Sequence, residues 1–200
     1  TKQKNGKLSA EIIIGDLRDF KSGKISREEA LEKIKVTTPE EEVSIEQDRE
    51  LLASIFDRLY RSDLSETFFI RGKVAYDNIE DFGVIYNLNF GFGAWRGTAQ
   101  LFGSRAPRTD ILGEEDIKNL YPQFEKQLLE NILDYGRTLN SLPKDEYLVV
   151  HAILDECQGC DIPEFLEVTI NSAFLMEYGS GKIDKASALE KMDIKKGELQ

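Results

Sequence analysis

The chain has 200 residues, of which 40% are hydrophobic and 32% are charged, and its formal net charge is −11. This composition predicts a globular protein with enough apolar material for a sizeable core. The acidic balance argues against nucleic acid, which is bound mainly by neutralising its phosphates, and against adhesion to anionic membranes. No run of eighteen apolar residues occurs, so no transmembrane segment is predicted.

The first predicted element is a strand at residues 12–14, followed by a helical hairpin at residues 17–36. Gly23 is expected to make the left-handed turn between the helices. Ser26 is expected to cap the second helix, and Glu29 sits three residues on, the spacing of a capping box. Residues 1–36 are therefore predicted to form an N-terminal strand and helical hairpin.

The hairpin sequence returns at residues 175–194, at a constant offset of 158. The copies, LRDFKSGKISREEALEKIKV and LMEYGSGKIDKASALEKMDI, are identical at nine of twenty positions, which indicates an internal duplication. A unit this short cannot bury its own apolar side, so each copy must pack on the rest of the chain or on another molecule. Either both hairpins only cap the fold, or they present related faces to a partner.

The segment between the hairpins predicts an α+β core over residues 44–194. Ser44 is expected to cap one helix, and Pro122 to open a second helix that Gly136 ends. Apolar patterning predicts a central strand that is buried on both faces and three further strands. Together they predict a small, mostly antiparallel sheet with a helical layer, flanked by the two hairpins, either as two parts or as one compact domain. The four strands are expected near residues 68–76, 84–90, 147–154 and 165–170.

Several short motifs occur in order along residues 46–194. They include Ser54-Ile55-Phe56-Asp57-Arg58, Asp81-Phe82-Gly83-Val84-Ile85, Leu133-Asp134-Tyr135-Gly136-Arg137-Thr138-Leu139, and Pro143, Asp145, Glu146 and Tyr147 before the closing hairpin. In these motifs the chain resembles a family of bacterial proteins of unknown function that are usually predicted to be exported. The resemblance implies a periplasmic or envelope-associated location, although this chain shows no signal peptide, and it supplies no catalytic residues. The cysteine pair and the glycine-rich segment depart from the family pattern.

Cys157 and Cys160 form the most suggestive chemical motif. Acidic neighbours such as Asp155 and Glu156 disfavour a thiolate, which argues against dithiol catalysis. Zinc would need further ligands, such as carboxylates, a second chain or His151. The remaining interpretation is a small disulfide, or two free thiols, tightening a loop, and a disulfide is favoured if the protein is exported. No metal or cofactor is predicted.

Residues 91–112 form a glycine-rich segment that carries Trp95, Arg96, Arg105 and Arg108 in an otherwise acidic protein. An aromatic ring beside guanidinium groups suits contact with a small anionic ligand or a peptide. Alternatively, the segment covers the sheet and its arginines pair with the acidic surface. Its glycine spacing matches neither common phosphate-binding loop.

No catalytic residue is predicted. His151 is the single histidine, and its strand neighbours supply neither a nucleophile nor an orienting acid. The sequence therefore favours a non-enzymatic, exported interaction or envelope-associated protein with a protein or small anionic ligand as partner. The alternatives are a thiol- or metal-dependent protein using Cys157 and Cys160, and an anion binder using residues 91–112. The oligomeric state is left open.

Overall fold

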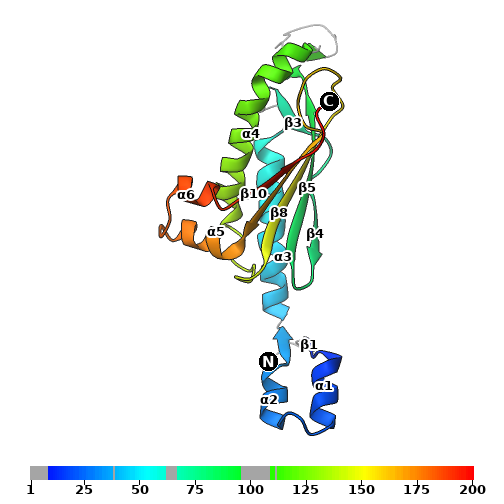
Figure 1. Cartoon of the computed structure of the whole chain (residues 1–200), viewed down its shortest axis with the longest axis vertical. Helices are drawn as coiled ribbons and strands as arrows, with labels where there is room; N and C mark the ends of the chain where they lie inside the picture. The colour runs from blue at the N-terminus through cyan, green and yellow to red at the C-terminus, as the bar shows by residue number, and fades with distance from the viewer. Residues whose placement is uncertain (1–8, 38, 62–66, 96–108, 111) are drawn as a thin grey trace, which may run out of the picture. The chain divides into compact units, whose positions relative to one another are not determined.

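The computed structural model describes residues 9–37, 39–61, 67–95, 109–110 and 112–200. The chain divides into two compact parts, Thr1–Gln47 and Asp48–Gln200, and each is described by itself. Figure 1 labels the helices and strands and colours them along the chain.

The N-terminal part contains a β-α-α-β arrangement made of β1 (Ser9–Glu11), α1 (Ile14–Lys21), α2 (Arg27–Glu32) and β2 (Lys35–Thr37). The two strands are antiparallel, with Ala10 opposite Val36. The strand expected at residues 12–14 was placed too late, because Ile14 already belongs to α1. Strand β2 was not predicted, and pairing with it is what fixes β1 at Ser9–Glu11.

The predicted hairpin turn and cap are confirmed. Gly23 has a φ of 74°, the left-handed conformation that glycine adopts at little cost. The Glu29 backbone N–H donates to the Ser26 hydroxyl at 3.1 Å, and the Ser26 N–H donates to the Glu29 carboxylate at 2.7 Å. This reciprocal pair is the capping box, and it sets the start of α2.

Helix α3 (Pro39–Leu59) begins five residues before Ser44, so the expected cap at Ser44 was wrong. Proline is favourable at the first helical position, where its missing N–H would have no partner in any case. The part of α3 from Asp48 onward belongs to the C-terminal part, where Leu52 and Phe56 are fully buried.

The C-terminal part is built on a six-stranded sheet, in the order β10-β9-β8-β5-β3 with β4 also paired to β5. The β5–β8 pair is parallel and the other pairs are antiparallel, which confirms the predicted α+β fold with a mostly antiparallel sheet. Strand β8 is central, as its apolar residues predict. The prediction that both of its faces are buried was wrong, because Tyr147 and Ile153 on its second face are 37% and 40% exposed. The strands are β3 (Phe68–Ile70), β4 (Ala75–Ile79), β5 (Gly83–Phe92), β8 (Tyr147–Leu154), β9 (Phe165–Asn171) and β10 (Asp193–Lys196).

The strand predicted at residues 68–76 is two strands, β3 and β4, because Gly72 takes a φ of 79° between them. Both strands pair with β5, and β4 and β5 form the expected hairpin. The carboxylate of Asp57, on α3, accepts the backbone N–H of Val74 at 3.0 Å and so ties the second strand to the helical layer.

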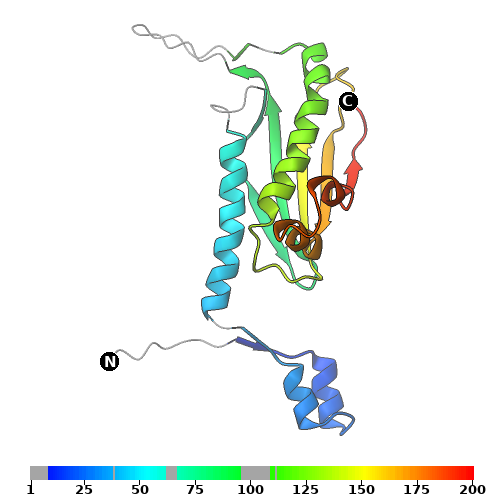
Figure 2. The same ribbon diagram turned by 90° about the vertical axis from the view of Figure 1, so that its left-hand side faces the viewer.

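Two long helices, α3 and α4 (Glu114–Gly136), cover one face of the sheet and run along the strands (Figure 2). Alternate residues of β5 face them, so Tyr86 and Phe90 are fully buried. The ring of Phe90 lies 5.1 Å from that of Tyr60, which directly follows α3, and 4.9 Å from that of Phe124 on α4, measured between centroids. This aromatic cluster joins the sheet to both helices.

Helix α4 begins at Glu114 rather than at Pro122, although it ends at Gly136 as predicted. Pro122 therefore lies inside the helix, where it removes one backbone hydrogen bond. The helix continues because its buried face extends on both sides of the proline, through Ile117 and Phe124.

The remaining elements are β6 (Ala94–Trp95), which pairs with β7 (Thr109–Asp110), and a second helical hairpin of α5 (Ser172–Gly179) and α6 (Lys185–Leu189). In the part of the chain that the structure describes, no helix combines the length and the apolar character needed to cross a membrane.

Candidate protein-interaction site

Residues 9–37, the N-terminal module, and residues 165–196, the C-terminal module, have the same β-α-α-β element order. At an offset of 158, Ile14–Lys21 corresponds to Ser172–Gly179. The strand register corresponds as well, because Ala10 faces Val36 in the first module and Val168 faces Ile194 in the second. The turn glycines also match, with φ values of 74° at Gly23 and 73° at Gly181.

The C-terminal module packs against the hydrophobic core of the C-terminal part. Its strand β9 lies between β10 and β8, and Val168 pairs with Val150 of β8. Its hairpin lies beside α4 (Figure 1). Leu175 and Ala188 are 2% and 0% exposed and belong to the main hydrophobic core. The module is thus an integral part of this fold.

Gly136, the last residue of α4, allows this close packing. A Cβ atom at Gly136 would lie 2.7 Å from Cδ2 of Leu148 on β8 and 3.3 Å from Cδ2 of Leu175 on α5. A side chain here would therefore collide with the sheet and crowd the module. The glycine in the motif at residues 133–139 is explained by this close approach.

Asp134, two residues earlier on α4, holds the module through polar contacts. Its carboxylate accepts a hydrogen bond from the Tyr178 hydroxyl at 2.6 Å and one from Nζ of Lys185 at 2.7 Å. Burial alone would raise the pKa of Asp134, but the hydrogen bonds from Lys185 and Tyr178 outweigh it and lower the pKa. The same hydrogen bonds raise the pKa of Lys185 and of Tyr178.

The corresponding face of the N-terminal module is exposed. Ile14 is 67% exposed, Leu17 38%, Phe20 40% and Leu31 55%. The counterparts of Ile14 and Leu17, Ser172 and Leu175, are each 2% exposed, and those of Phe20 and Leu31, Tyr178 and Leu189, are partly buried against the core. Within the described residues, β1 pairs with β2 alone. The N-terminal module thus has an open strand edge and an open apolar face at the positions that the C-terminal module buries.

The chemistry of the docking face is kept in part, although Ile14 replaces Ser172. Leu17 corresponds to Leu175, Phe20 to Tyr178 and Arg27 to Lys185. Arg27 therefore carries a cation where Lys185 pairs with Asp134. No ion pair joins Arg27 to another residue in the described ranges.

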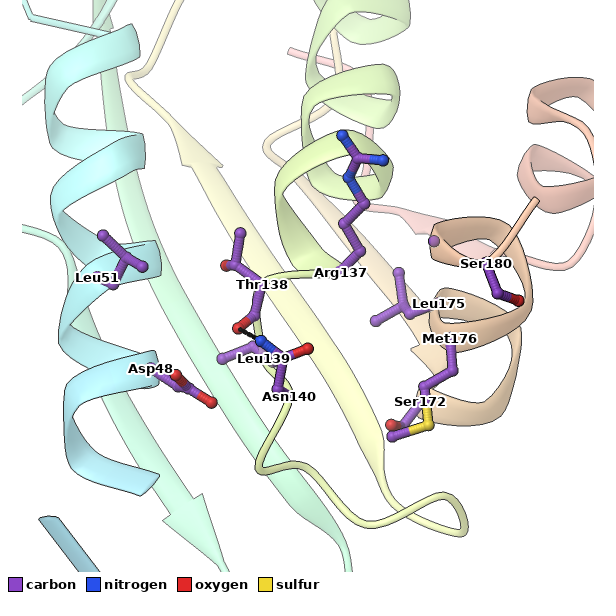
Figure 3. Close-up of a pocket in the computed structure, with 11 residues that line it drawn as sticks. Asp48, Leu51, Arg137, Thr138, Leu139, Asn140, Ser172, Leu175, Met176 and Ser180 are labelled. Carbon is purple, nitrogen blue, oxygen red and sulfur yellow. Dashed lines mark hydrogen bonds between the residues drawn. The ribbon is translucent and has the colours of Figure 1, made fainter. Parts of the chain in front are cut away.

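A groove of about 620 Å³ lies beside the C-terminal module (Figure 3). Leu51 and Asp48 of α3 form one wall, and α5 residues such as Met176 form the other. Asp48 and Arg137 are its ionisable lining residues, and the Asp48 carboxylate already accepts the Ser141 N–H at 3.0 Å. This lining gives the groove no grouped catalytic or ligand-anchoring side chains.

The predicted ligand-binding residues are only partly within the described ranges. Trp95 lies in β6, with Thr109 opposite it in β7. Arg96, Arg105 and Arg108 lie outside the described residues. The prediction that residues 91–112 bind an anion therefore stays a prediction.

Cys157 and Cys160 are joined by a disulfide in the segment that follows β8. Both are buried, at 7% and 0% exposed. The C-terminal residue packs here, because the side chain of Gln200 accepts the Cys157 N–H at 3.0 Å and donates to the Asp155 carbonyl at 2.9 Å. The burial of both cysteines suits a structural role, and neither cysteine lines the groove.

His151 is half-buried on β8, and its ring meets that of Phe165 edge to face at a centroid distance of 5.3 Å. Its neighbours Val150 and Ala152 point toward the helices, so His151 belongs to the opposite face of the sheet. Among the described residues, no three His, Cys, Asp or Glu side chains are grouped as a metal ion would require.

The docking contacts between Asp134, Tyr178 and Lys185 were not predicted, although all three residues lie in motifs that the sequence shows. The available signal was that Arg27 in the first copy aligns with Lys185 in the second, so that both copies have a cation at the same helical position. Without the fold, nothing linked that cation to an acid 51 residues away.

Comparisons with protein-family models, curated proteins and solved structures found no match for this chain.

Proposed function

We propose that this protein is a non-enzymatic interaction protein whose N-terminal module, residues 9–37, is its protein contact site. One observation carries the proposal: a face that the C-terminal module buries is exposed in the N-terminal module, at corresponding positions. Grouped apolar side chains at a protein surface are characteristic of binding sites.

The energetics favour a protein partner over a small ligand. The exposed fraction of the four apolar residues is between 38% and 67%; they are Ile14, Leu17, Phe20 and Leu31. Covering each of them would contribute roughly 1 kcal/mol or more at about 25 cal/mol per Å² of apolar area. The open edge of β1 adds backbone donors and acceptors that a partner strand would satisfy.

The proposed setting is outside the cytoplasm, in the periplasm or at the cell envelope. The resemblance to exported bacterial proteins supports this setting, and so does the Cys157–Cys160 disulfide, because such bonds persist in oxidising compartments.

Site-specific photo-crosslinking in the cells that make the protein tests the proposal. A photoreactive amino acid at Phe20 is expected to give a discrete adduct with another protein. The same amino acid at Lys24, whose side chain is 71% exposed in the turn, is the matched control and is expected to give none. Ile14→Asp together with Leu17→Asp should remove the Phe20 adduct. Equal adducts at both positions, or none at either, would contradict the proposal.

A further inference from the structure

We infer that the partner of the N-terminal module is an α+β core of the same kind as residues 48–166 of this chain, with a free strand edge like that of β8 and a helix end like that of α4. This inference rests on the proposed function and names the class of partner. It follows from what surrounds the C-terminal module, position by position.

The strand edge is the first requirement. In the C-terminal part, β9 is paired on one side with β10 and on the other with β8, from Tyr147 opposite Asn171 to Ile153 opposite Phe165. The N-terminal module reproduces the β9–β10 register but, in the described residues, pairs β1 on one side alone. Ala10 is exposed, whereas its counterpart Val168 is fully buried. A strand equivalent to β8 fits the open edge of β1.

The apolar face is the second requirement. Leu17 has the same side chain as Leu175, which packs beside Gly136 and Leu148. Leu31 corresponds to Leu189, which packs against the main core. A partner helix that ends in glycine and packs on a strand with a leucine would therefore accommodate Leu17. In this chain α4 and β8 accommodate Leu175 in that way.

The cation is the third requirement. Lys185 reaches Asp134 of α4, and the N-terminal module holds Arg27 at the same position. Phe20 replaces Tyr178 and has no hydroxyl, so a partner carboxylate would be held by the guanidinium and not by a phenol. Arginine compensates because its planar fork can make two hydrogen bonds to one carboxylate.

An intact second copy of this chain does not offer such a site. Its β8 edge is already paired with β9 over seven residue pairs, and its Asp134 is already paired with Lys185. The fitting partner is a core of this kind that does not carry a seated module of its own.

A fusion tests the inference directly. Residues 39–166 are fused directly before Ser9, so that Ser9 follows the added Leu166. Ser9 then takes the place that Glu167 has after Leu166 in β9, and the strand register is kept. The N-terminal module should then seat on the added core, and amide exchange at residues 10–12 should slow at least 100-fold relative to the unfused chain. The matched control places residues 39–200 ahead of Ser9, so that the added core carries its own module. In that control, exchange at residues 10–12 should stay fast.

Charge reversal sharpens the test. Arg27→Glu in the fusion should raise the exchange rate of residues 10–12 at least several-fold, and Asp134→Lys in the added core should restore the slow rate. Exchange that stays fast in the fusion, or an added core that unfolds there while the control core folds, would overturn the inference. If the inference fails while the Phe20 adduct persists, the interaction function stands with a partner of another class.

Discussion

The Lys185 ammonium donates to the Asp134 carboxylate at 2.7 Å, and this ion pair joins α6 of the C-terminal module to α4 of the core. The N-terminal module has Arg27 at the position of Lys185, with no ion-pair partner among the described residues. One module is therefore docked, and the other carries a matching leucine and cation on an exposed face.

Asp134→Asn should destabilise the C-terminal part by about 0.5–1 kcal/mol. The pair is 41% and 32% exposed at its two side chains, so solvent screening keeps its contribution small. Urea unfolding followed by circular dichroism measures the loss. Glu130→Gln on the same helix is the control, because Glu130 lies 4.0 Å from Lys126 in a surface pair and should change the stability by less than about 0.3 kcal/mol.

The effect of Asp134→Asn should depend on pH. The folded-state pKa of Asp134 is lowered below its ordinary value of 3.8, so its stabilisation is complete above that pH and is lost as the pH falls through the lowered pKa. The pKa of Lys185 is raised above 10.5, so its stabilisation holds below that pH and is lost as the pH rises through the raised pKa. The difference in unfolding free energy between wild type and variant should be constant between about pH 5 and 10 and shrink toward pH 3. A difference that stays constant down to pH 3 would argue against the pair.

Gly136→Ala should destabilise the protein by about 1–2 kcal/mol, although alanine is normally the better helix former. The added methyl group would lie 2.7 Å from Leu148 Cδ2, and Leu148 is fully buried. Gly179→Ala is the matched control, because a Cβ there meets Arg137 at an ordinary 3.5 Å. That variant should be neutral or slightly more stable, and thermal unfolding compares the two. A stabilised Gly136→Ala protein would show that α4 does not approach Leu148 of β8 so closely.

Leu175→Ala and Leu17→Ala make the same change at corresponding positions and should differ in effect. Leu175 is 2% exposed, so its truncation should cost about 2–4 kcal/mol of the stability of the C-terminal part. Leu17 is 38% exposed, so its truncation should change that stability by less than about 0.5 kcal/mol. Hydrogen exchange of the β8 amides reports both values. Similar costs for the two variants would mean that the N-terminal face is also buried.

The disulfide should act as a staple. Replacing both Cys157 and Cys160 by serine should cost about 2 kcal/mol or less, because the bond closes a loop of only a few residues. Cys160 has no exposed surface, so after mild reduction of the native protein it should react with iodoacetamide far more slowly than in urea. Rapid alkylation of both thiols in the native state would instead favour a thiol-active protein.

Local sequence patterns were sufficient for much of the fold. Ser26 and Glu29 specify a cap through neighbouring backbone groups, and the apolar run of β8 indicates a central strand, although its second face is only partly buried. Helix starts were harder, because Pro122 and Ser44 resemble start signals locally. The buried face of α4 continues on both sides of Pro122 and overrides that signal.

The docking site depended on long-range contacts, which no local pattern contains. Asp134 meets Lys185 only because β9 pairs with β8 and so carries the following hairpin back to α4. The aligned copies showed that Arg27 and Lys185 are alike, but a single chain gives no sign that one is docked and the other exposed. The exposed fractions of Leu17 and Leu175 supply that distinction.

The most direct test of the account is amide hydrogen exchange at the two corresponding strands in the isolated 200-residue protein. Val168 and Thr169 of β9 have partner strands on both sides, whereas β1 has one among the described residues. We predict that Val168 and Thr169 exchange only through global unfolding and that their counterparts Ala10 and Glu11 exchange at least 100-fold faster through local opening. Equal, slow exchange at both strands would show that the N-terminal module is already seated within the chain and would contradict the account.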